Sequence, residues 1–560
     1  MRIQLRGLVA VAFLWATGSA LAGSPLADRS QLNRLGYIPP QCFTRTQDAP
    51  GGAAQNPCYA CHSEARPPNF DSQPELQLSY DFPQLQGGRQ IVNEWSNLFV
   101  DRRQAIAAID DGAVLAYVRQ DNYRDAQGSI ALAERLSPKS LPAAWDVDGD
   151  KRWGGYLPDA AFRFDARGFD IDAAGRPTGW RAYRYYPFPG AFMPTNGSFD
   201  DVLIRLPAAF RETADGRYDA EVYAANLAII EALITRADVA IDPVDEKSLG
   251  VDLDRDGELG QARTVRYDWA PTQGRQMNYV GRAEAERRAG QLHLAAGLFP
   301  EGTEFLHSVR YLDVSADGHI EPAPRMKELR YARKRYWMSW SDLDVQATVE
   351  GKEEALNPDR EELFHGDAER GMDNAKGWRY QGFIEDQAGA LRPQSFAETA
   401  FCLGCHGGLS ATEDSNFSFV RKLSGGTAHG WSEWGERPYD GLPDPKDASG
   451  QRAYASYLMA NRAGDEYRAN DEVRMRFFDA DGQPRADAFA RLESDLSTLL
   501  LPSRERALAL DKAYWLLVRE QSFDRGRDPL LAPAANVYRE VPLEQSTGIA
   551  SPLPFPPLAR

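Results

Sequence analysis

The chain has 560 residues, of which 43% are hydrophobic and 11% aromatic, with 47 glycines and 36 prolines. This length predicts roughly two to four domains, and the composition is that of a folded, loop-rich protein rather than a disordered one. A net charge of −17 argues against nucleic acid and anionic membrane surfaces as partners and favours a basic partner.

The first residues are typical of an export signal, predicted for residues 1–22. Arg2 and Arg6 precede an apolar stretch, and Ala20 and Ala22 mark a small-residue cleavage site. No cysteine follows this site, and no later stretch reaches the ~18 apolar residues of a membrane-spanning helix. We therefore expect an exported, periplasmic protein without a lipid anchor at that site and without a transmembrane segment.

Three of the five cysteines lie early in the chain, where Cys58, Cys61 and His62 form a C-x-x-C-H motif. Cys42 precedes this motif and has no obvious partner. A buried, inert thiol is the favoured interpretation of Cys42, and the alternatives are a bond to another chain or a thiolate ligand to a bound metal. The run at 111–123 has a helical apolar pattern with Asp111 as its N-cap, so a first domain is predicted at 23–135.

The middle region, 136–325, alternates short β-prone runs with turns around one amphipathic helix at 219–237. Two acidic loops in it resemble calcium-binding loops, because their carboxylates alternate as the ligands of a hard cation do. Neither loop has the acid that usually completes such a site. The candidate calcium ligands are Asp146, Asp148 and Asp150 in the first loop and Asp252, Asp254 and Asp256 in the second.

Residues 304–314 alternate like a strand and place His307 on an apolar face with Phe305, which makes His307 a candidate for a metal ligand or a pocket residue. The following run, 325–337, is a basic island in an acidic protein. We weigh a solvent-exposed helix face equally against an anion-binding role for this run.

The last third, 326–560, is predicted to be mostly helical, with a helix at 502–523. Ser395 and Glu398 form a capping-box pattern directly before a second C-x-x-C-H motif, which predicts that the motif lies on a short helix. Its residues are Cys402, Cys405 and His406.

C-x-x-C-H is the attachment signature of c-type haem. The two thiols bond to the vinyl groups of one porphyrin, and the adjacent histidine coordinates its iron. A redox dithiol would need no histidine, and the cysteine pairs of structural zinc sites usually lie ~12–20 residues apart, far closer than these. The sequence therefore predicts two covalently attached haem c groups, with Cys58, Cys61, Cys402 and Cys405 as the attachment residues and His62 and His406 as iron ligands.

On the motifs at 58–62 and 402–406 the chain resembles bacterial exported di-haem c-type cytochromes. We therefore expect an α+β fold in which helical, cytochrome-c-like haem regions at both ends enclose a loop-rich, partly β middle region. If propionates are present, the basic run at 325–337 could pair with them.

The sixth iron ligand decides what such a protein does. The candidates for it are His307, His429 and Met372, the last of which we expect in a loop, and a Cys42 thiolate would point to sulfur substrates. Three functions stay open. The first is electron transfer with a redox partner that is basic or another cytochrome, the second is an oxidoreductase with one reactive haem acting on a peroxide or sulfur compound, and the third is a haem-bearing sensor or subunit of a larger complex.

Overall fold

The computed structural model describes residues 36–46, 55–82, 90–189, 196–356, 364–423, 429–433, 435, 439–462, 470–543 and 545–559. The predicted export signal lies outside these residues.

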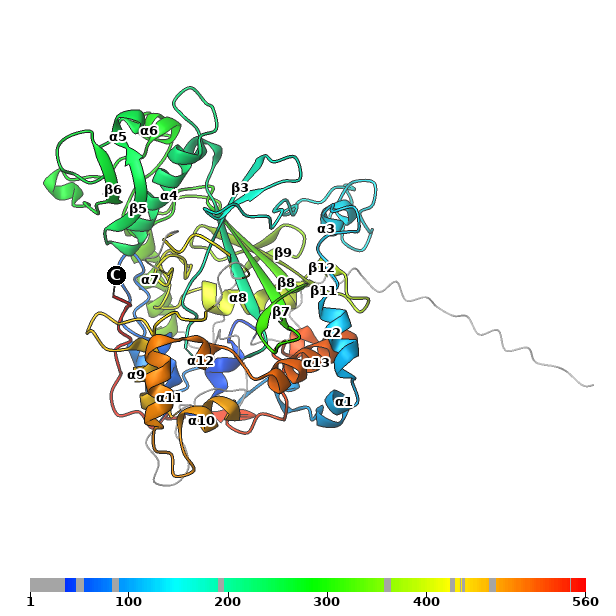
Figure 1. Cartoon of the computed structure of the whole chain (residues 1–560). Helices are drawn as coiled ribbons and strands as arrows, with labels where there is room; N and C mark the ends of the chain where they lie inside the picture. The colour runs from blue at the N-terminus through cyan, green and yellow to red at the C-terminus, as the bar shows by residue number, and fades with distance from the viewer. Residues whose placement is uncertain are drawn as a thin grey trace, which may run out of the picture.

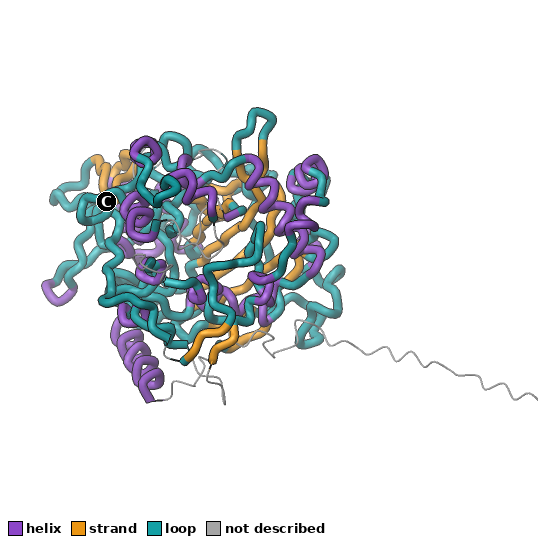
Figure 2. Tube along the Cα trace, turned by 90° about the horizontal axis from the view of Figure 1, so that it is seen from below, coloured by secondary structure: helices purple, strands orange, loops and turns teal. Residues whose placement is uncertain are grey.

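A nine-stranded antiparallel sheet forms the centre of the protein (Figures 1 and 2). Its order is β2-β3-β4-β7-β8-β11-β10-β9, and β12 also pairs with β11. Its strands are β2 (Phe169–Ile171), β3 (Pro177–Tyr183), β4 (Phe199–Arg205), β7 (Glu304–Val314), β8 (Ile320–Lys334), β9 (His365–Asp367), β10 (Gly371–Asp373), β11 (Trp378–Glu385) and β12 (Leu391–Pro393).

Two further pairs of strands lie outside the large sheet. One joins β1 (Gln90–Val92) to β13 (Glu540–Pro542), and so ties the early part of the chain to its end. The other joins β5 (Val239–Asp245) to β6 (Gln261–Val265) in a small lobe with α4, α5 and α6, at the upper left of Figure 1.

Thirteen α-helices surround the sheet within the described residues. They are α1 (Arg103–Ala107), α2 (Asp111–Val118), α3 (Ala131–Arg135), α4 (Ala220–Thr235), α5 (Glu246–Leu249), α6 (Gly281–Arg288), α7 (Trp340–Leu356), α8 (Phe396–His406), α9 (Ala453–Asn461), α10 (Asp471–Phe477), α11 (Ala486–Ser494), α12 (Ser497–Leu500) and α13 (Arg504–Glu520). None of them is long and apolar enough to cross a membrane.

The longest strands, β7 and β8, form the hairpin at the middle of the sheet. In their register His307 lies opposite Arg330, and on its other side His307 pairs with Val202 of β4. Ionic partners allow β8 to be buried although it is rich in arginine and lysine: Arg325 contacts Glu385 at 3.0 Å and Lys334 contacts Asp414 at 2.5 Å. A buried charge persists only when it is paired in this way.

Several local predictions are confirmed. The strand predicted at 304–314 is β7, and the helices predicted at 219–237 and 502–523 are α4 and α13. The helix predicted at 111–123 is α2, although its N-cap is Asp110 rather than Asp111.

The expected fold class is wrong. The described residues show no helical, cytochrome-like ends, because the central sheet continues past the predicted middle region to β12. The predicted boundary between residues 325 and 326 falls inside β8. The basic run is therefore not a solvent-exposed helix face but a central strand, in which pairing with carboxylates keeps the charges buried.

Candidate functional site

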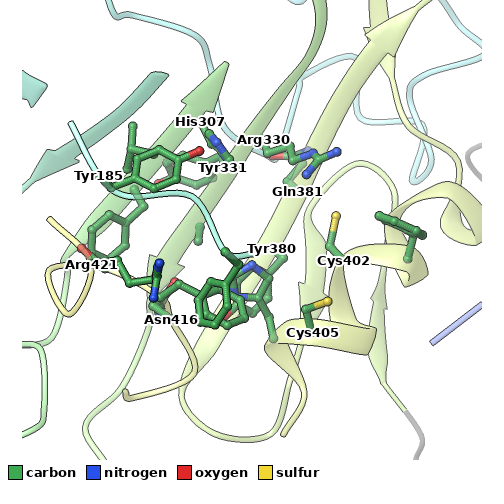
Figure 3. Close-up of a pocket in the computed structure, with 18 of the residues that line it drawn as sticks. Tyr185, His307, Arg330, Tyr331, Tyr380, Gln381, Cys402, Cys405, Asn416 and Arg421 are labelled. Atoms are coloured by element: carbon green, nitrogen blue, oxygen red, sulfur yellow. The ribbon is translucent and has the colours of Figure 1, made fainter. Parts of the chain in front are cut away.

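The main cavity of the site lies between the central sheet and α8, with about 1110 Å³ of space counting its open mouth. Figure 3 shows His307 and Arg330 on the side of the sheet and Cys402 and Cys405 on α8. His406 also lines the cavity. The rest of the wall is largely aromatic: Tyr183, Tyr185, Phe188, Phe305, Tyr331, Tyr380, Phe401 and Phe417. The cavity suits a large, mostly apolar group with a few polar attachment points.

Helix α8 presents the second C-x-x-C-H motif to this cavity. The capping box predicted at its start is present, since the Ser395 hydroxyl accepts from the Glu398 amide and the Glu398 carboxylate accepts from the Ser395 amide. Residues three and four apart lie on one face of a helix. Cys402, Cys405 and His406 therefore all point to the same side, as predicted.

His406 is held by its Nδ1 atom, which donates to the Ser415 carbonyl oxygen at 2.8 Å. The Tyr380 ring packs against its imidazole with 4.8 Å between the ring centroids. Burial lowers the pKa of His406 to about 4, so the imidazole is neutral at physiological pH. This hydrogen bond leaves Nε2 as the unprotonated nitrogen, which is the arrangement typical of a metal-ligating histidine.

His307 enters the same cavity from β7. Its buried Nε2 has no hydrogen-bond partner within the described residues, and the nearest carboxylate oxygen, on Asp200, is 3.6 Å away. Burial, followed by the nearby charge of Arg330, lowers the pKa of His307 to about 3. A buried polar atom without a partner is costly, so this nitrogen calls for a ligand in the cavity.

The first motif is built differently, on the 3₁₀ turn Pro57–Ala60. Its histidine is nevertheless held in the same manner, because His62 Nδ1 donates to Gln73 Oε1 at 3.1 Å. Burial lowers the pKa of His62 as well. Both motif histidines thus have Nδ1 occupied by an oxygen acceptor.

The two motifs, far apart in the sequence, are neighbours in the structure. Gln73 also donates from Nε2 to the Gly408 carbonyl at 3.0 Å, directly behind the second motif. The Asn69 side chain bonds the carbonyls of Leu409 and Thr412 at 2.9 Å. The chain before the first motif packs on α8 so closely that a Cβ at Gly404 would lie 2.1 Å from the Tyr37 carbonyl oxygen.

Within the described residues the cysteines form neither a disulfide nor a zinc site. All five are free thiols. Burial raises the pKa of Cys58 and Cys405 to about 12 and that of Cys61 to about 11, so these thiols stay protonated at neutral pH, unlike a reactive dithiol. No group of cysteine and histidine ligand atoms within the described residues converges as a zinc site requires.

Cys42 lies beside both motifs and is partly buried. Burial is the largest cause of its raised pKa, followed by the charges of Cys58 and Cys405. This environment agrees with the buried-thiol interpretation and places Cys42 within the same site.

Two predicted iron ligands lie elsewhere. Met372 is on strand β10, not in a loop, and is fully buried in the hydrophobic core. His429 lines a different cavity, with its Nε2 3.6 Å from Asp242. Of the three candidates for the sixth ligand, only His307 reaches the cavity of the second motif.

The acidic loops each gather three carboxylates. Asp146, Asp148 and Asp150 converge as predicted, whereas in the second loop Glu246 joins Asp252 and Asp254 in place of Asp256. Glu246 is buried and accepts from the amides of Leu253 and Gly260, at 2.6 and 2.8 Å. Calcium binding at either loop stays a prediction.

Sequence reasoning missed Gln73 and Ser415, the two acceptors that orient the motif histidines. A glutamine side chain and a backbone carbonyl carry no local sequence signal, so only the folded structure could identify them.

A family model described as "-like lipoprotein" matches residues 27–486, and the chain therefore belongs to this lipoprotein family. It is also 28% identical to a protein of Aquifex aeolicus (strain VF5) named "Uncharacterized lipoprotein", over 98% of this chain and 96% of that protein. No solved structure matches the chain significantly.

The resemblance to di-haem c-type cytochromes that was inferred from the two motifs is wrong, because the comparisons find a lipoprotein family and no cytochrome family. The names of the family and of the relative likewise do not support the assignments predicted from the sequence, which were cytochrome c, haem, iron, electron transfer, oxidoreductase and calcium. The motifs misled because two five-residue patterns describe only their immediate surroundings and not the fold. Membership in a lipoprotein family fits an exported protein of the cell envelope.

Proposed function

We propose that this lipoprotein carries two covalently attached haem groups, one at each C-x-x-C-H motif, and that it transfers electrons. The observation that carries the proposal is shared by both motifs: His62 and His406 each have Nδ1 bonded to an oxygen, and Nε2 has no hydrogen bond within the described residues. A histidine that ligates a metal ion almost always has its other ring nitrogen bonded in this way.

The donor atoms that line the cavity of the second motif are of the kinds that bind haem. Cys402 and Cys405 are placed to form thioethers, in which each sulfur bonds to one carbon of a vinyl group and the thiol proton goes to the other. His406 and His307 both line the cavity and offer two imidazole ligands. When bound, haem supplies a one-electron iron centre.

The chain's own residues would orient this group and keep water from it. The aromatic wall encloses an apolar body, while Arg330 and Arg421 place two cations on the lining, where carboxylates of the group could pair. Arg330 is fixed by Glu328 at 2.9 Å, and Arg421 donates from Nε to the Tyr186 carbonyl at 2.6 Å. Two imidazole ligands from the protein would leave no open iron position at this centre, which favours electron transfer over a small-molecule reaction there.

The closeness of the two motifs supports transfer between two centres in one molecule. Gln73 contacts both motifs, and Phe188 and Phe417 line the cavity while packing in the same cluster as Tyr59 of the first motif. The proposal places the protein in the periplasm, where its net charge of −17 would suit a basic redox partner or another redox protein of opposite local charge.

Mass spectrometry of protein exported from cells with an intact haem-attachment system tests the proposal. The expected mass is that of the mature chain plus two haems. The double variant Cys402→Ala/Cys405→Ala should carry one haem, and the control Cys42→Ser should carry two. A native chain that carries no haem would overturn the proposal.

A further inference from the structure

A second cavity lies away from the haem-motif site, between α4, β5 and the segment 429–431, with about 570 Å³ of space counting its open mouth. One of its walls is made of small side chains, and we call it the alanine cavity. These residues are Ala166, Ala224, Ala225, Ala228 and Ala240. The lining also carries Arg181, Arg167, His429 and Trp431 and the carboxylates of Glu221 and Asp242, so the cavity combines an apolar floor with charged groups of both signs.

The lining holds two arginines and two carboxylates, Glu221 and Asp242, and these groups are not all in contact with one another. Arg167 contacts Glu221 at 2.5 Å, and His429 lies 3.6 Å from Asp242. Arg181 has no ion pair within the described residues. The nearby Glu231 is already bound to Lys422 at 2.8 Å. The Arg181 guanidinium is therefore left without a carboxylate in contact with it among the described residues.

Arg181 is nevertheless 95% buried, at 5% exposure, and is held in a fixed position. Its Nε donates to the Arg167 carbonyl at 3.0 Å. Its guanidinium lies between two aromatic rings, 3.9 Å from the Trp431 centroid and 4.4 Å from that of Phe169. No hydrogen bond from its terminal nitrogens occurs within the described part of the chain.

Burial of a cation without a carboxylate partner is unfavourable, and this lowers the pKa of its guanidinium. Burial, followed by the repulsion of Arg167, lowers the pKa of Arg181 to about 9. A buried charge that lacks a partner usually marks a place where a ligand supplies one. The aromatic clamp and the bond to Arg167 orient the guanidinium, so that its free N–H groups could bind an anion with two parallel hydrogen bonds.

We propose that the alanine cavity binds a small organic monocarboxylate, with Arg181 pairing its carboxylate and the alanine floor holding its apolar body. One guanidinium without a carboxylate contact matches a monovalent anion better than a divalent phosphate, which Glu221 and Asp242 in the same lining would repel more strongly. The small floor residues leave room for a short alkyl chain, which would be buried there by the hydrophobic effect. This proposal does not depend on haem attachment.

Isothermal titration of the full mature protein tests it with three probes: butyrate, butylamine and inorganic phosphate. Butyrate should bind, whereas butylamine, which has the same alkyl body and the opposite charge, should not. Phosphate should bind more weakly than butyrate. Phosphate binding as tight as that of butyrate would overturn the carboxylate assignment, and no detectable butyrate binding would overturn the site.

Two variants test the residues. Arg181→Met should weaken butyrate binding by at least roughly tenfold, the size of a lost charged hydrogen bond, without lowering the melting temperature of the free protein. Ala224→Leu fills the floor and should weaken butyrate binding while leaving Arg181 in place. The matched control is Arg176→Gln, since Arg176 is exposed and, in the described part of the chain, pairs only with Asp172. Unchanged butyrate binding in Arg181→Met would overturn the role of Arg181, and a large fall in its melting temperature would assign Arg181 to stability instead.

Discussion

Gln73 donates a hydrogen bond to the carbonyl of Gly408 at 3.0 Å, which fastens the loop behind the first C-x-x-C-H motif to the end of the second. The other end of the same side chain accepts from His62. One amide therefore orients a motif histidine and joins two segments that lie hundreds of residues apart. This link holds the segments that carry the two motifs beside each other.

Replacing Gln73 with alanine should destabilise the protein. Both bonds of the amide would be lost, and the His62 ring and the Gly408 carbonyl would each lose a partner in a partly buried place. We expect a loss of about 1–3 kcal/mol, measured by urea unfolding. Gln104→Ala, at an exposed position of α1, is the control and should change little. Equal effects of the two substitutions would contradict the role of Gln73 as a link.

Substitution of Gly404 should separate the segment before the first motif from α8. A Cβ at this position would meet the Tyr37 carbonyl oxygen at 2.1 Å and Pro39 Cδ at 2.9 Å, and backbone cannot give way as a flexible side chain can. Gly404→Ala is expected to cost about 1–3 kcal/mol, the usual cost of overpacking, in the free energy of unfolding.

Another helical glycine provides the opposite expectation. A Cβ added at Gly351 in α7 would meet no described atom within 4 Å, so Gly351→Ala should be neutral or stabilise by up to about 1 kcal/mol, because alanine favours helix. If Gly404→Ala and Gly351→Ala have the same effect in this unfolding assay, the close contact between Gly404 and the Tyr37 carbonyl is contradicted.

Local patterns predicted the elements that carry the second motif, and long-range contacts account for what they missed. The capping box of α8 and the alternation of β7 depend on residues a few positions apart, so they could be recognised in the sequence. The link between Gln73 and Gly408 depends on the whole fold and leaves no such trace.

The basic run 325–337 shows why charge alone misleads about structure. Its arginines and lysines left a solvated helix face and an anion-binding role equally open, yet β8 buries Arg325 and Lys327 and gives Arg325 a carboxylate partner from β11. That partner, Glu385, follows much later in the chain. The family could not be predicted for a similar reason. Two short motifs carry no information on the large sheet that dominates the fold of this lipoprotein.

Asp511 should make the free energy of unfolding fall as the pH rises. This α13 residue is fully buried, and within the described residues only one of its oxygens has a hydrogen bond, from the Leu312 amide at 3.3 Å. Burial raises the pKa of Asp511 to about 8, although Lys327 opposes the shift. Between pH ~4 and ~8 the unfolded chain therefore loses this proton while the folded protein keeps it, and stability falls as pH rises.

Asp511→Asn removes this titration. Between pH 5 and pH 8 the free energy of unfolding of the variant should rise relative to that of the wild type by at least about 1 kcal/mol, measured by urea unfolding at each pH. The exposed Asp481→Asn serves as control and should follow the wild type at every pH. A difference between Asp511→Asn and wild type that stays constant across this range would show that Asp511 is ionised in the folded protein.

His307→Met tests the ligand assignment in the haem-loaded protein and rests on the proposed function. A methionine in place of a second imidazole raises the reduction potential of a haem, so we expect one of two centres to shift upward, on the order of 100 mV, by redox titration. The centre at the first motif should keep its potential. His429→Met is the matched control, because His429 lines the alanine cavity and not the cavity of the second motif. If His307→Met leaves both the spin state and the potential of each centre unchanged, His307 is not an iron ligand, and its unpartnered Nε2 must serve another group in that cavity.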